Sequence, residues 1–290
     1  MRDGLEAVGY LAGESTALVS FLAAKLGKPV LVEGPAGVGK TELAKALSRS
    51  TGRKLIRLQC YEGLDEAKAL YEWNYRKQLL RIQTESADTG WEAVQDDIFG
   101  PEFLLSRPLL QAIDQPEPVV LLVDEIDKTD QEFEAMLLEV LSDFQISIPE
   151  LGVIEAKSRP LVLLTSNNSR ELTEALKRRC LYLWLDYPEV DRELEIVRLH
   201  APELSETIAR KLVEVVHMIR GLDLKKPPSI AESIDWARAL LMLGADDIDS
   251  SVFERTMSII VKHRTDLDVV AERVGVKLDD GVLGRLGTTG

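Results

Sequence analysis

The stretch Gly34-Pro35-Ala36-Gly37-Val38-Gly39-Lys40-Thr41 decides the fold of this chain. It follows the apolar run Pro29-Val30-Leu31-Val32, which has the composition of a strand, and precedes Glu42 to Leu47, a segment with helical periodicity. Glycines at such a turn let backbone N–H groups approach phosphate oxygens at the N-terminus of the following helix. We therefore predict a loop that binds the phosphates of a nucleotide, and we include Glu42 among its contacts.

Two side chains at the end of this loop have the chemistry that a nucleoside triphosphate requires. Lys40 is expected to reach the β- and γ-phosphates, and the hydroxyl of Thr41 is expected to bind Mg²⁺. The alternative is a glycine-rich turn between a strand and a helix that binds nothing. The strand before the loop and the helix after it favour the phosphate loop, because the motif requires that context.

A second strong signal is the apolar run Val119 to Val123, which is followed by Asp124 and Glu125. Such a run is typical of a strand buried on both faces, and ligands bind at the C-terminal edge of parallel strands. Asp124 suits a carboxylate associated with Mg²⁺, and Glu125 suits a base that polarises the attacking water. A helix-capping role is the alternative for this aspartate. The strand Pro160 to Thr165 ends at the same edge, so Asn167 is expected to position the water or contact the γ-phosphate, although asparagines are also common turn residues.

Strands alternate with helices over the first part of the chain, which predicts an α/β fold with a parallel sheet flanked by helices. Helical periodicity alone continues afterwards and predicts a smaller all-α domain. We predict a phosphate-loop α/β domain over residues 1–187, a helical lid domain over 188–270 and a flexible tail over 271–290. The expected elements are helices over 14–26, 101–113, 131–142, 171–176, 189–199, 204–220, 229–243 and 250–262, strands over 54–60 and 180–185, a hairpin over 144–155 and a polar surface loop over 84–100.

Composition limits the class of protein. The 290 residues are 45% hydrophobic and 29% charged, as in ordinary soluble globular proteins, and no apolar run approaches the length of a membrane span. The segment Arg2 to Glu6 contains acidic residues where a signal peptide has a basic region, so we expect a cytoplasmic protein. The formal charge of −14 argues against nucleic acid as a partner. Cys60 and Cys180 are expected to be small buried hydrophobes, and the three scattered histidines do not predict a metal site.

An aromatic cluster, Tyr71, Trp73 and Tyr75, precedes the basic pair Arg76-Lys77. The spacing of two predicts a strand or loop with one exposed face. Two interpretations stay open: the rings cap a local hydrophobic patch, or they grip a substrate or a partner protein.

The order of these motifs resembles that of the AAA+ ATPases: the phosphate loop, the Asp-Glu strand end, the Asn strand, Ala175 to Arg179 and then a helical domain. The resemblance extends from roughly residue 5 to residue 265. The segment Asp143 to Ala156, with its predicted hairpin, resembles the MoxR branch. Within that branch, Glu102 to Leu109 and Leu164 to Leu172 resemble ATPases that assist maturation of the molybdenum and copper carbon monoxide dehydrogenase.

The resemblance implies roles for individual residues. Gly34 to Thr41 match the Walker A motif, Asp124 and Glu125 match the Walker B motif, and Asn167 matches sensor 1. It also implies that ATP and Mg²⁺ are the ligands. Hydrolysis would proceed by in-line attack of a water oriented by Glu125.

The resemblance further implies a ring, usually a hexamer, in which an arginine reaches the γ-phosphate bound by the neighbouring subunit. Arg178 and Arg179 are the candidates for this arginine, although the dipole of the preceding helix alone would also favour cations there. The family's second sensor arginine has no counterpart in Ser229-Ile230-Ala231, and Arg238 lies about two turns later. Gly9-Tyr10 falls where related chains pass the adenine.

The resulting functional hypothesis is an ATPase that remodels or matures a client protein. The resemblance suggests a metalloenzyme as the client and a protein with a von Willebrand factor A domain as a partner. One alternative is an ATP-gated binding module that holds a partner without remodelling it, which would be distinguished by whether the partner accelerates turnover. A small-molecule kinase of the phosphate-loop class is a third possibility, which transfer of labelled phosphate to water alone would exclude.

Overall fold

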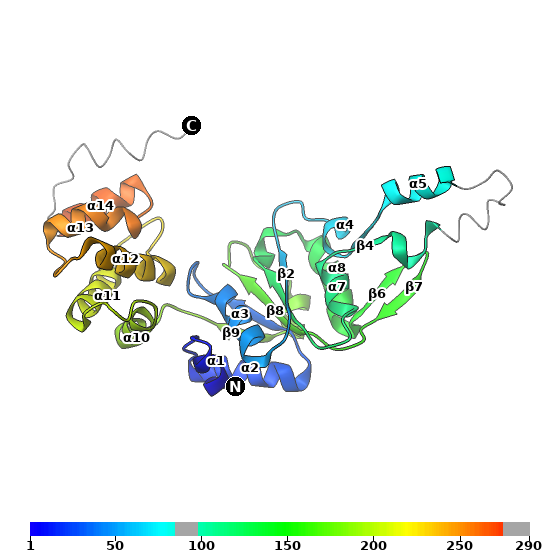
Figure 1. Ribbon diagram of the computed structural model, residues 1–290, viewed down its shortest axis with the longest axis horizontal. Coiled ribbons are helices and arrows are strands. Elements are labelled where there is room, and N and C mark those ends of the chain that lie inside the picture. The colour runs from blue at the N-terminus through cyan, green and yellow to red at the C-terminus, as the bar shows by residue number, and fades with distance from the viewer. Residues whose placement is uncertain (85–97, 275–290) are drawn as a thin grey trace. The chain divides into compact units, whose positions relative to one another are not determined.

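The computed structural model describes residues 1–84 and 98–274 of the chain (Figure 1). The chain divides into two compact units. The α/β unit comprises Met1–Gly34 and Lys40–Leu185, and the helical unit comprises Pro35–Gly39 together with the residues from Asp186 onward. The tip of the predicted phosphate loop thus groups with the helical unit. The predicted domain limits at residues 187 and 188 stay a prediction.

A parallel sheet forms the centre of the α/β unit, as the sequence predicts. Its order is β2-β5-β8-β1-β9, and every neighbouring pair is parallel. The strands are β1 (Val30–Glu33), β2 (Leu55–Gln59), β5 (Val120–Asp124), β8 (Leu161–Ser166) and β9 (Leu181–Trp184). The strands β5 and β8, which carry the apolar runs over residues 119–123 and 161–164, lie side by side and are buried along their whole length.

Alternate residues of each strand face opposite sides of the sheet, so each face buries its own core. On one face, Val32 and Leu122 pack with residues of α1 (Arg2–Ala7), α2 (Glu14–Leu26) and α3 (Lys40–Thr51). On the other face, Leu121 and Leu164 pack with residues of α7 (Pro108–Ile113), α8 (Gln131–Asp143) and α9 (Glu174–Arg179). The sheet is therefore covered on both sides, which explains why its central strands are continuously hydrophobic.

Two antiparallel strand pairs extend the α/β unit. The predicted hairpin over 144–155 is confirmed as β6 (Gln145–Ile148) paired with β7 (Gly152–Glu155). The second pair joins β3 (Tyr71–Trp73) with β4 (Leu104–Ser106), which are far apart in the chain. It lies between α4 (Glu66–Ala69), α5 (Tyr75–Thr84) and the short 3-10 helix η1 (Pro101–Phe103).

The prediction of one helix over residues 101–113 is wrong. The segment contains η1, then β4, and only then the helix α7. Arg107 is extended at φ −95° and ψ 172°, as expected for a residue before a proline, and Pro108 begins the new helix. The backbone N–H groups of Asn74 and Arg107 bond to Phe103 and Leu70, so pairing with a distant segment overrides the local helical pattern.

Two further boundaries differ from the predictions. The helix expected over 171–176 begins later, at Glu174, because the Thr173 side chain caps it by accepting a hydrogen bond from the N–H of Leu176. The polar loop expected over 84–100 lies largely outside the described residues.

The helical unit is built from helices around one apolar core that includes the fully buried Trp236. Its elements are α10 (Val190–His200), α11 (Glu206–Arg220), α12 (Ile230–Leu243), α13 (Ser250–Thr256), the 3-10 helix η3 (Met257–Ile259) and α14 (Arg264–Val274). The helix expected over 250–262 is shorter, since Thr256 accepts from the indole N–H of Trp236 and donates back to the carbonyl of Val252. Residues 271–274 belong to α14, not to the expected tail, and the tail from 275 onward lies outside the described residues. No helix in the described ranges is both long and apolar enough to cross a membrane.

Candidate active site

Three neighbouring strands deliver the predicted site residues to one edge of the sheet. The order β5-β8-β1 places the end of β8 between the ends of the other two strands. In this register Thr165 lies beside Val32, and Leu164 lies beside Val123. The phosphate loop after β1, Asn167 after β8 and Asp124 at the end of β5 therefore meet, as the sequence predicts for carboxyl ends of parallel strands.

The backbone of the loop explains its glycines. Gly34 has φ +153°, and a Cβ atom there would lie 1.9 Å from the carbonyl oxygen of Leu185. Gly37 has φ +78°, and a Cβ atom there would lie 2.2 Å from the Cβ of Ser229 within the helical unit. Both positions combine a positive φ with a close neighbour, so only glycine fits them without rearrangement.

Lys40, the first residue of α3, is buried and connects two strand ends. Its ammonium donates to the carbonyl oxygen of Gly34 at 2.6 Å and to Oδ1 of Asn167 at 2.8 Å. Burial lowers the pKa of Lys40, and the carboxylates of Asp127 and Asp124 oppose that effect by stabilising the charged form. The structure thus joins Lys40 and Asn167, which lie 127 positions apart in the chain, in one polar contact.

Thr41 and Asp124 form the pair of oxygen donors that a magnesium site needs. The threonine Oγ1 lies 3.0 Å from Oδ1 and 3.2 Å from Oδ2 of the aspartate. The carboxylate is 2% exposed and also accepts a hydrogen bond from Thr165 at 2.5 Å. Hydroxyl and carboxylate oxygens are the hard ligands that Mg²⁺ prefers, so the residues present fit the ion.

Glu125 follows directly and has a left-handed backbone, with φ 58° and ψ 50°. This conformation is uncommon for a residue other than glycine, and it occurs often at functional sites. The N–H of Glu125 donates to Oγ1 of Thr165 at 2.9 Å, and the side chain is only partly buried. The glutamate is therefore more accessible than Asp124, which lies on the buried strand before it.

The turn that carries Asn167 is held by Asp127, a residue that the sequence analysis did not single out. Its Oδ2 accepts from the backbone N–H and the hydroxyl of Ser169, at 3.0 and 2.6 Å. Burial alone raises the pKa of Asp127, but the hydrogen bonds from Ser169 and from the backbone of Asn167 outweigh burial, so the pKa lies below its ordinary value. The carboxylate therefore stays charged and fixes the turn beside Lys40.

Arg57 on β2 is the second residue that sequence reasoning missed. Its guanidinium donates to Oδ2 of Asp124 through Nε at 3.0 Å and through Nη2 at 2.6 Å. The sequence held one signal for it: a charged residue between the apolar Ile56 and Leu58 of a predicted strand. Only the sheet order, which places β2 beside β5, identifies its partner.

The remaining predicted contacts lie in different surroundings. Arg178 and Arg179 are exposed in the last turn of α9, where neither pairs with a carboxylate in the described part of the chain. Glu42 pairs with Arg49 at 2.6 Å and with Lys45 at 3.3 Å on its own helix, so its carboxylate serves α3 itself.

Two further predicted positions are located by the structure. Tyr10 packs partly buried against the core of α1–α3, next to Gly9 with φ +82°. Arg238 is half exposed on α12 and faces Asp235 of the same helix at 3.9 Å.

The aromatic cluster is divided by the structure. The ring of Trp73 is buried and makes edge contacts with Tyr71 and Phe99, at centroid distances of 6.5 and 5.2 Å. Tyr75 begins α5 and is 62% exposed. Two rings thus serve a local hydrophobic patch, and the third remains on the surface. Burial also raises the pKa of the Cys60 thiol to about 12, which fits a small buried hydrophobe.

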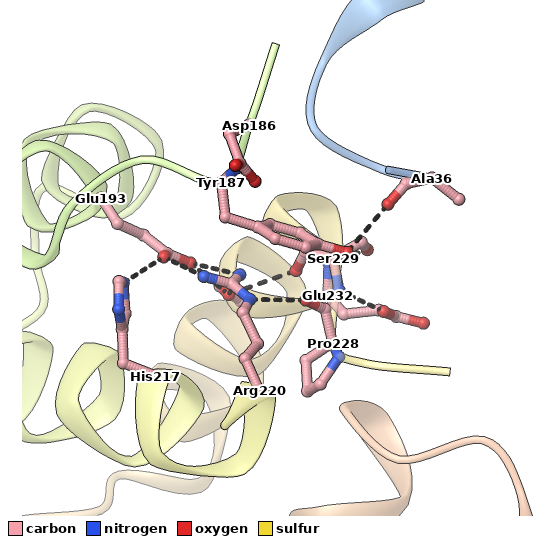
Figure 2. A network of polar contacts seen from close by, with 10 residues as sticks. Ala36, Asp186, Tyr187, Glu193, His217, Arg220, Pro228, Ser229 and Glu232 are labelled. Atoms are coloured by element: carbon pink, nitrogen blue, oxygen red, sulfur yellow. Dashed lines mark hydrogen bonds and ion pairs between the residues drawn. The ribbon is translucent and has the colours of Figure 1, made fainter. Parts of the chain in front are cut away.

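The tip of the loop takes part in a polar network of the helical unit (Figure 2). The hydroxyl of Tyr187 donates to the carbonyl oxygen of Ala36 at 3.1 Å. The backbone N–H of Ile230 donates to the carbonyl oxygen of Gly37 at 3.2 Å. The ring of Tyr187 lies 4.4 Å from the guanidinium carbon of Arg220, which in turn pairs with a buried glutamate, Glu193. The contacts through Tyr187 and Arg220 therefore connect the carbonyl groups of the loop tip to the core of the helical unit.

Comparison with known proteins agrees with this geometry. Residues 30–183 match the family described as ATPase family associated with various cellular activities (AAA). The chain is similar to the gas vesicle ATPase GvpN1 of Halobacterium salinarum, with 26% identity over 272 residues that cover 88% of this chain and 75% of that protein. It is also similar to the protein NorQ of Paracoccus denitrificans, with 26% identity over 229 residues that cover 76% and 75% of the two chains.

A solved structure supports the fold. A RuvB point mutant of Thermotoga maritima superposes with a TM-score of 0.52 and 18% identity, covering 92% of this chain and 82% of that one. The family match spans the strands β1 to β9, and thus every strand end that forms the site described above. This chain therefore belongs to the ATPase family associated with various cellular activities, whose reaction is the hydrolysis of ATP with Mg²⁺.

Proposed function

We propose that this chain is an AAA+ ATPase of the MoxR branch that works in a ring and uses ATP hydrolysis to remodel a client protein, with a metalloenzyme under assembly as the client. The observation that carries the proposal is the contact of Lys40 with Asn167, because it joins the phosphate loop to the polar residue that follows the neighbouring strand β8. The similarity to GvpN1 and NorQ and the hairpin β6–β7 support this branch.

The residues divide the chemistry of hydrolysis among them. Glu125 orients the attacking water and accepts its proton, while Lys40 and Asn167 contact the γ-phosphate oxygens on which charge develops. Thr41 and Asp124 would hold Mg²⁺, and the ion would supply positive charge to the phosphates of the bound nucleotide. Arg57 and Asp127 act through Asp124 and Asn167, so they are positioning residues.

In the proposed ring, a neighbouring subunit supplies one more positive charge to the γ-phosphate. Arg178 and Arg179 lie exposed at the end of a helix, where they are available to a neighbouring subunit. An arginine supplied in this way stabilises the transferring phosphoryl group and can contribute about 10³–10⁵ in rate. Loss of the γ-phosphate would then change the contacts between subunits, and this change would act on the client.

The base is tested by Glu125→Gln. The variant should bind ATP with the affinity of the wild type and lose at least about 100-fold in turnover, because the amide cannot accept a proton. Glu132→Gln, on the exposed first turn of α8, is the matched control and should hydrolyse ATP normally. Normal turnover by Glu125→Gln would exclude the assigned base.

The shared site is tested by mixing subunits. Arg178→Ala and Arg179→Ala should each be assayed alone and mixed with Lys40→Ala, since a mixed ring restores one complete site from two defective chains. Recovery of turnover in the mixture is expected for the arginine that acts in trans. A monomer in size-exclusion chromatography with ATP, together with no recovery, would contradict the ring.

The client is tested by affinity capture with the Glu125→Gln variant, which holds ATP without hydrolysing it. A captured client that accelerates wild-type turnover supports remodelling. A captured partner that binds only with ATP and leaves turnover unchanged would favour an ATP-gated binding module instead. The same capture tests for a partner with a von Willebrand factor A domain, and cell fractionation tests the expected cytoplasmic location.

A further inference from the structure

The contact between Arg57 and Asp124 is unusual for a carboxylate that is to bind a metal ion. The aspartate is 2% exposed at the end of β5, and the arginine reaches it from the neighbouring strand β2. Nε and Nη2 both donate to the same oxygen, Oδ2, at 3.0 and 2.6 Å. A full positive charge thus lies directly against the carboxylate.

Burial explains why the carboxylate needs such a partner. An ionised carboxylate removed from water is costly unless hydrogen bonds and an opposite charge compensate it. Thr41 and Thr165 supply hydroxyl donors to Asp124, but hydroxyls are neutral. Arg57 adds a countercharge at hydrogen-bond distance.

The arginine is nevertheless placed so that it can withdraw. Its side chain is 47% exposed, whereas that of Asp124 is 3% exposed. Its Nη2 also donates to Oε1 of Gln59, two residues further along β2, so the guanidinium has a second acceptor outside the carboxylate. Arg57 can therefore move away from Oδ2 without losing all its hydrogen bonds.

We propose that Arg57 is a built-in countercharge that competes with Mg²⁺ for Asp124. It stabilises the aspartate when no nucleotide is bound, and it raises the Mg²⁺ concentration at which the nucleotide site fills. The inference rests on the proposed role of Asp124 as a magnesium ligand. A like charge beside a cation site weakens binding, so removal of the arginine should strengthen it.

The test compares wild type with Arg57→Gln, which keeps an amide donor and removes the charge. Thermal unfolding is followed with saturating ADP while MgCl₂ is titrated from an EDTA baseline. Without Mg²⁺ the variant should melt about 2–4 °C below wild type. With Mg²⁺ this difference should shrink, and the half-saturating Mg²⁺ concentration should fall about fivefold, which corresponds to about 1 kcal/mol.

Two variants serve as controls. Arg57→Lys keeps the charge and should retain the wild-type Mg²⁺ midpoint. Arg107→Gln removes an arginine of similar exposure, 40%, that follows β4 and pairs with Glu72 of β3 at the same distance, 2.6 Å. Its loss of stability should be the same with and without Mg²⁺, as for any merely structural pair.

The outcomes test the role of Arg57 and the magnesium site separately. An equal Mg²⁺ midpoint in wild type and Arg57→Gln, with a clear Mg²⁺ response in both, overturns the role of Arg57 alone. No Mg²⁺ response in the wild type overturns the magnesium site as well. If Arg57→Gln does not fold, Arg57→Met is titrated in the same way, and ADP binding measured by calorimetry at several MgCl₂ concentrations gives the same decision.

Discussion

Asp124 and Glu193 are buried carboxylates that each pair with an arginine, and the two pairs are built differently. Asp124 of the α/β unit faces Arg57, whose side chain is 47% exposed. Glu193 of the helical unit faces Arg220, whose side chain is 8% exposed (Figure 2). Both glutamate oxygens accept from Arg220, and His217 and Ser233 complete the shell at 2.9 and 2.7 Å.

The difference indicates what each pair is for. Arg220 is fixed on every side, since its Nε donates to the carbonyl of Pro228 at 2.7 Å and Tyr187 lies over its guanidinium. Such a pair joins α10, α11 and α12 and has no reason to open. Arg57 has a solvent-accessible path and lies on a carboxylate with metal-binding chemistry, so its pair is suited to exchange. Burial of the cation distinguishes a structural ion pair from one that a ligand can replace.

The largest effect is expected from Arg220→Ala. It leaves Glu193 buried without a countercharge, and removal of one partner from a buried pair costs about 3–5 kcal/mol. Arg57→Ala also leaves a buried carboxylate without its ion-pair partner, but it should cost less, about 1–2 kcal/mol, because Arg57 is partly solvated and the hydroxyls of Thr41 and Thr165 still donate to Asp124. Urea unfolding at neutral pH measures both values.

Arg210→Ala is the matched control for this comparison, since Arg210 lies on the same helix as Arg220 but pairs with Asp191 on the surface at 3.5 Å. Its effect should stay below about 1 kcal/mol. Equal losses from Arg57→Ala and Arg220→Ala would remove the distinction between the two pairs.

The next effect concerns Asp127 and depends on pH. Its folded-state pKa lies below the unfolded value of about 3.9, so its charge stabilises the fold above that pH, and this contribution is lost as pH falls through the folded pKa. Asp127→Asn should therefore lose about 1–3 kcal/mol at neutral pH. The difference from wild type should shrink below about pH 4. A difference that is constant from pH 7 to pH 3 would show that the charge is irrelevant.

A smaller effect is expected from Thr165→Val. The buried hydroxyl accepts from the N–H of Glu125 and donates to Asp124, so its removal leaves that N–H without a partner at a left-handed residue. The cost should be about 1–2 kcal/mol. Because Glu125 would then be misplaced in the transition state, kcat should also fall about tenfold. Thr165→Ser should restore both stability and kcat, whereas failure of the serine would point to the methyl group.

Sequence reasoning found the parts of the site that local pattern encodes. Lys40 and Thr41 stand in a motif, Asp124 and Glu125 follow a continuous apolar strand, and Asn167 ends another. Their meeting at one edge follows from parallel strands alone. The prediction of the sheet, the hairpin β6–β7 and most helices succeeded for the same reason, because hydrophobic periodicity and breakers determine them locally.

The missed residues depend on spatial order, which local pattern does not contain. Arg57 acts on Asp124 because β2 neighbours β5, although 67 positions separate the two residues. Asp127 reaches Ser169 because β5 neighbours β8. The failed helix over 101–113 has the same origin, since β4 forms only by pairing with β3. Contacts between distant segments override local propensity in each case.

The smallest effect is expected from Arg238→Ala, because this arginine belongs to neither kind of pair. Arg238 is 51% exposed and faces Asp235 of its own helix at 3.9 Å, so it is neither buried like Arg220 nor held on a site carboxylate like Arg57. Exposed helix pairs contribute about 0.3–0.5 kcal/mol, and we expect ATP turnover within about twofold of wild type. Arg255→Ala, at an exposed position of α13, is the control. A selective loss of turnover in Arg238→Ala with unchanged stability would instead assign this arginine to the nucleotide, because an exposed cation that contributes nothing to folding can affect hydrolysis only through a ligand or a neighbouring subunit.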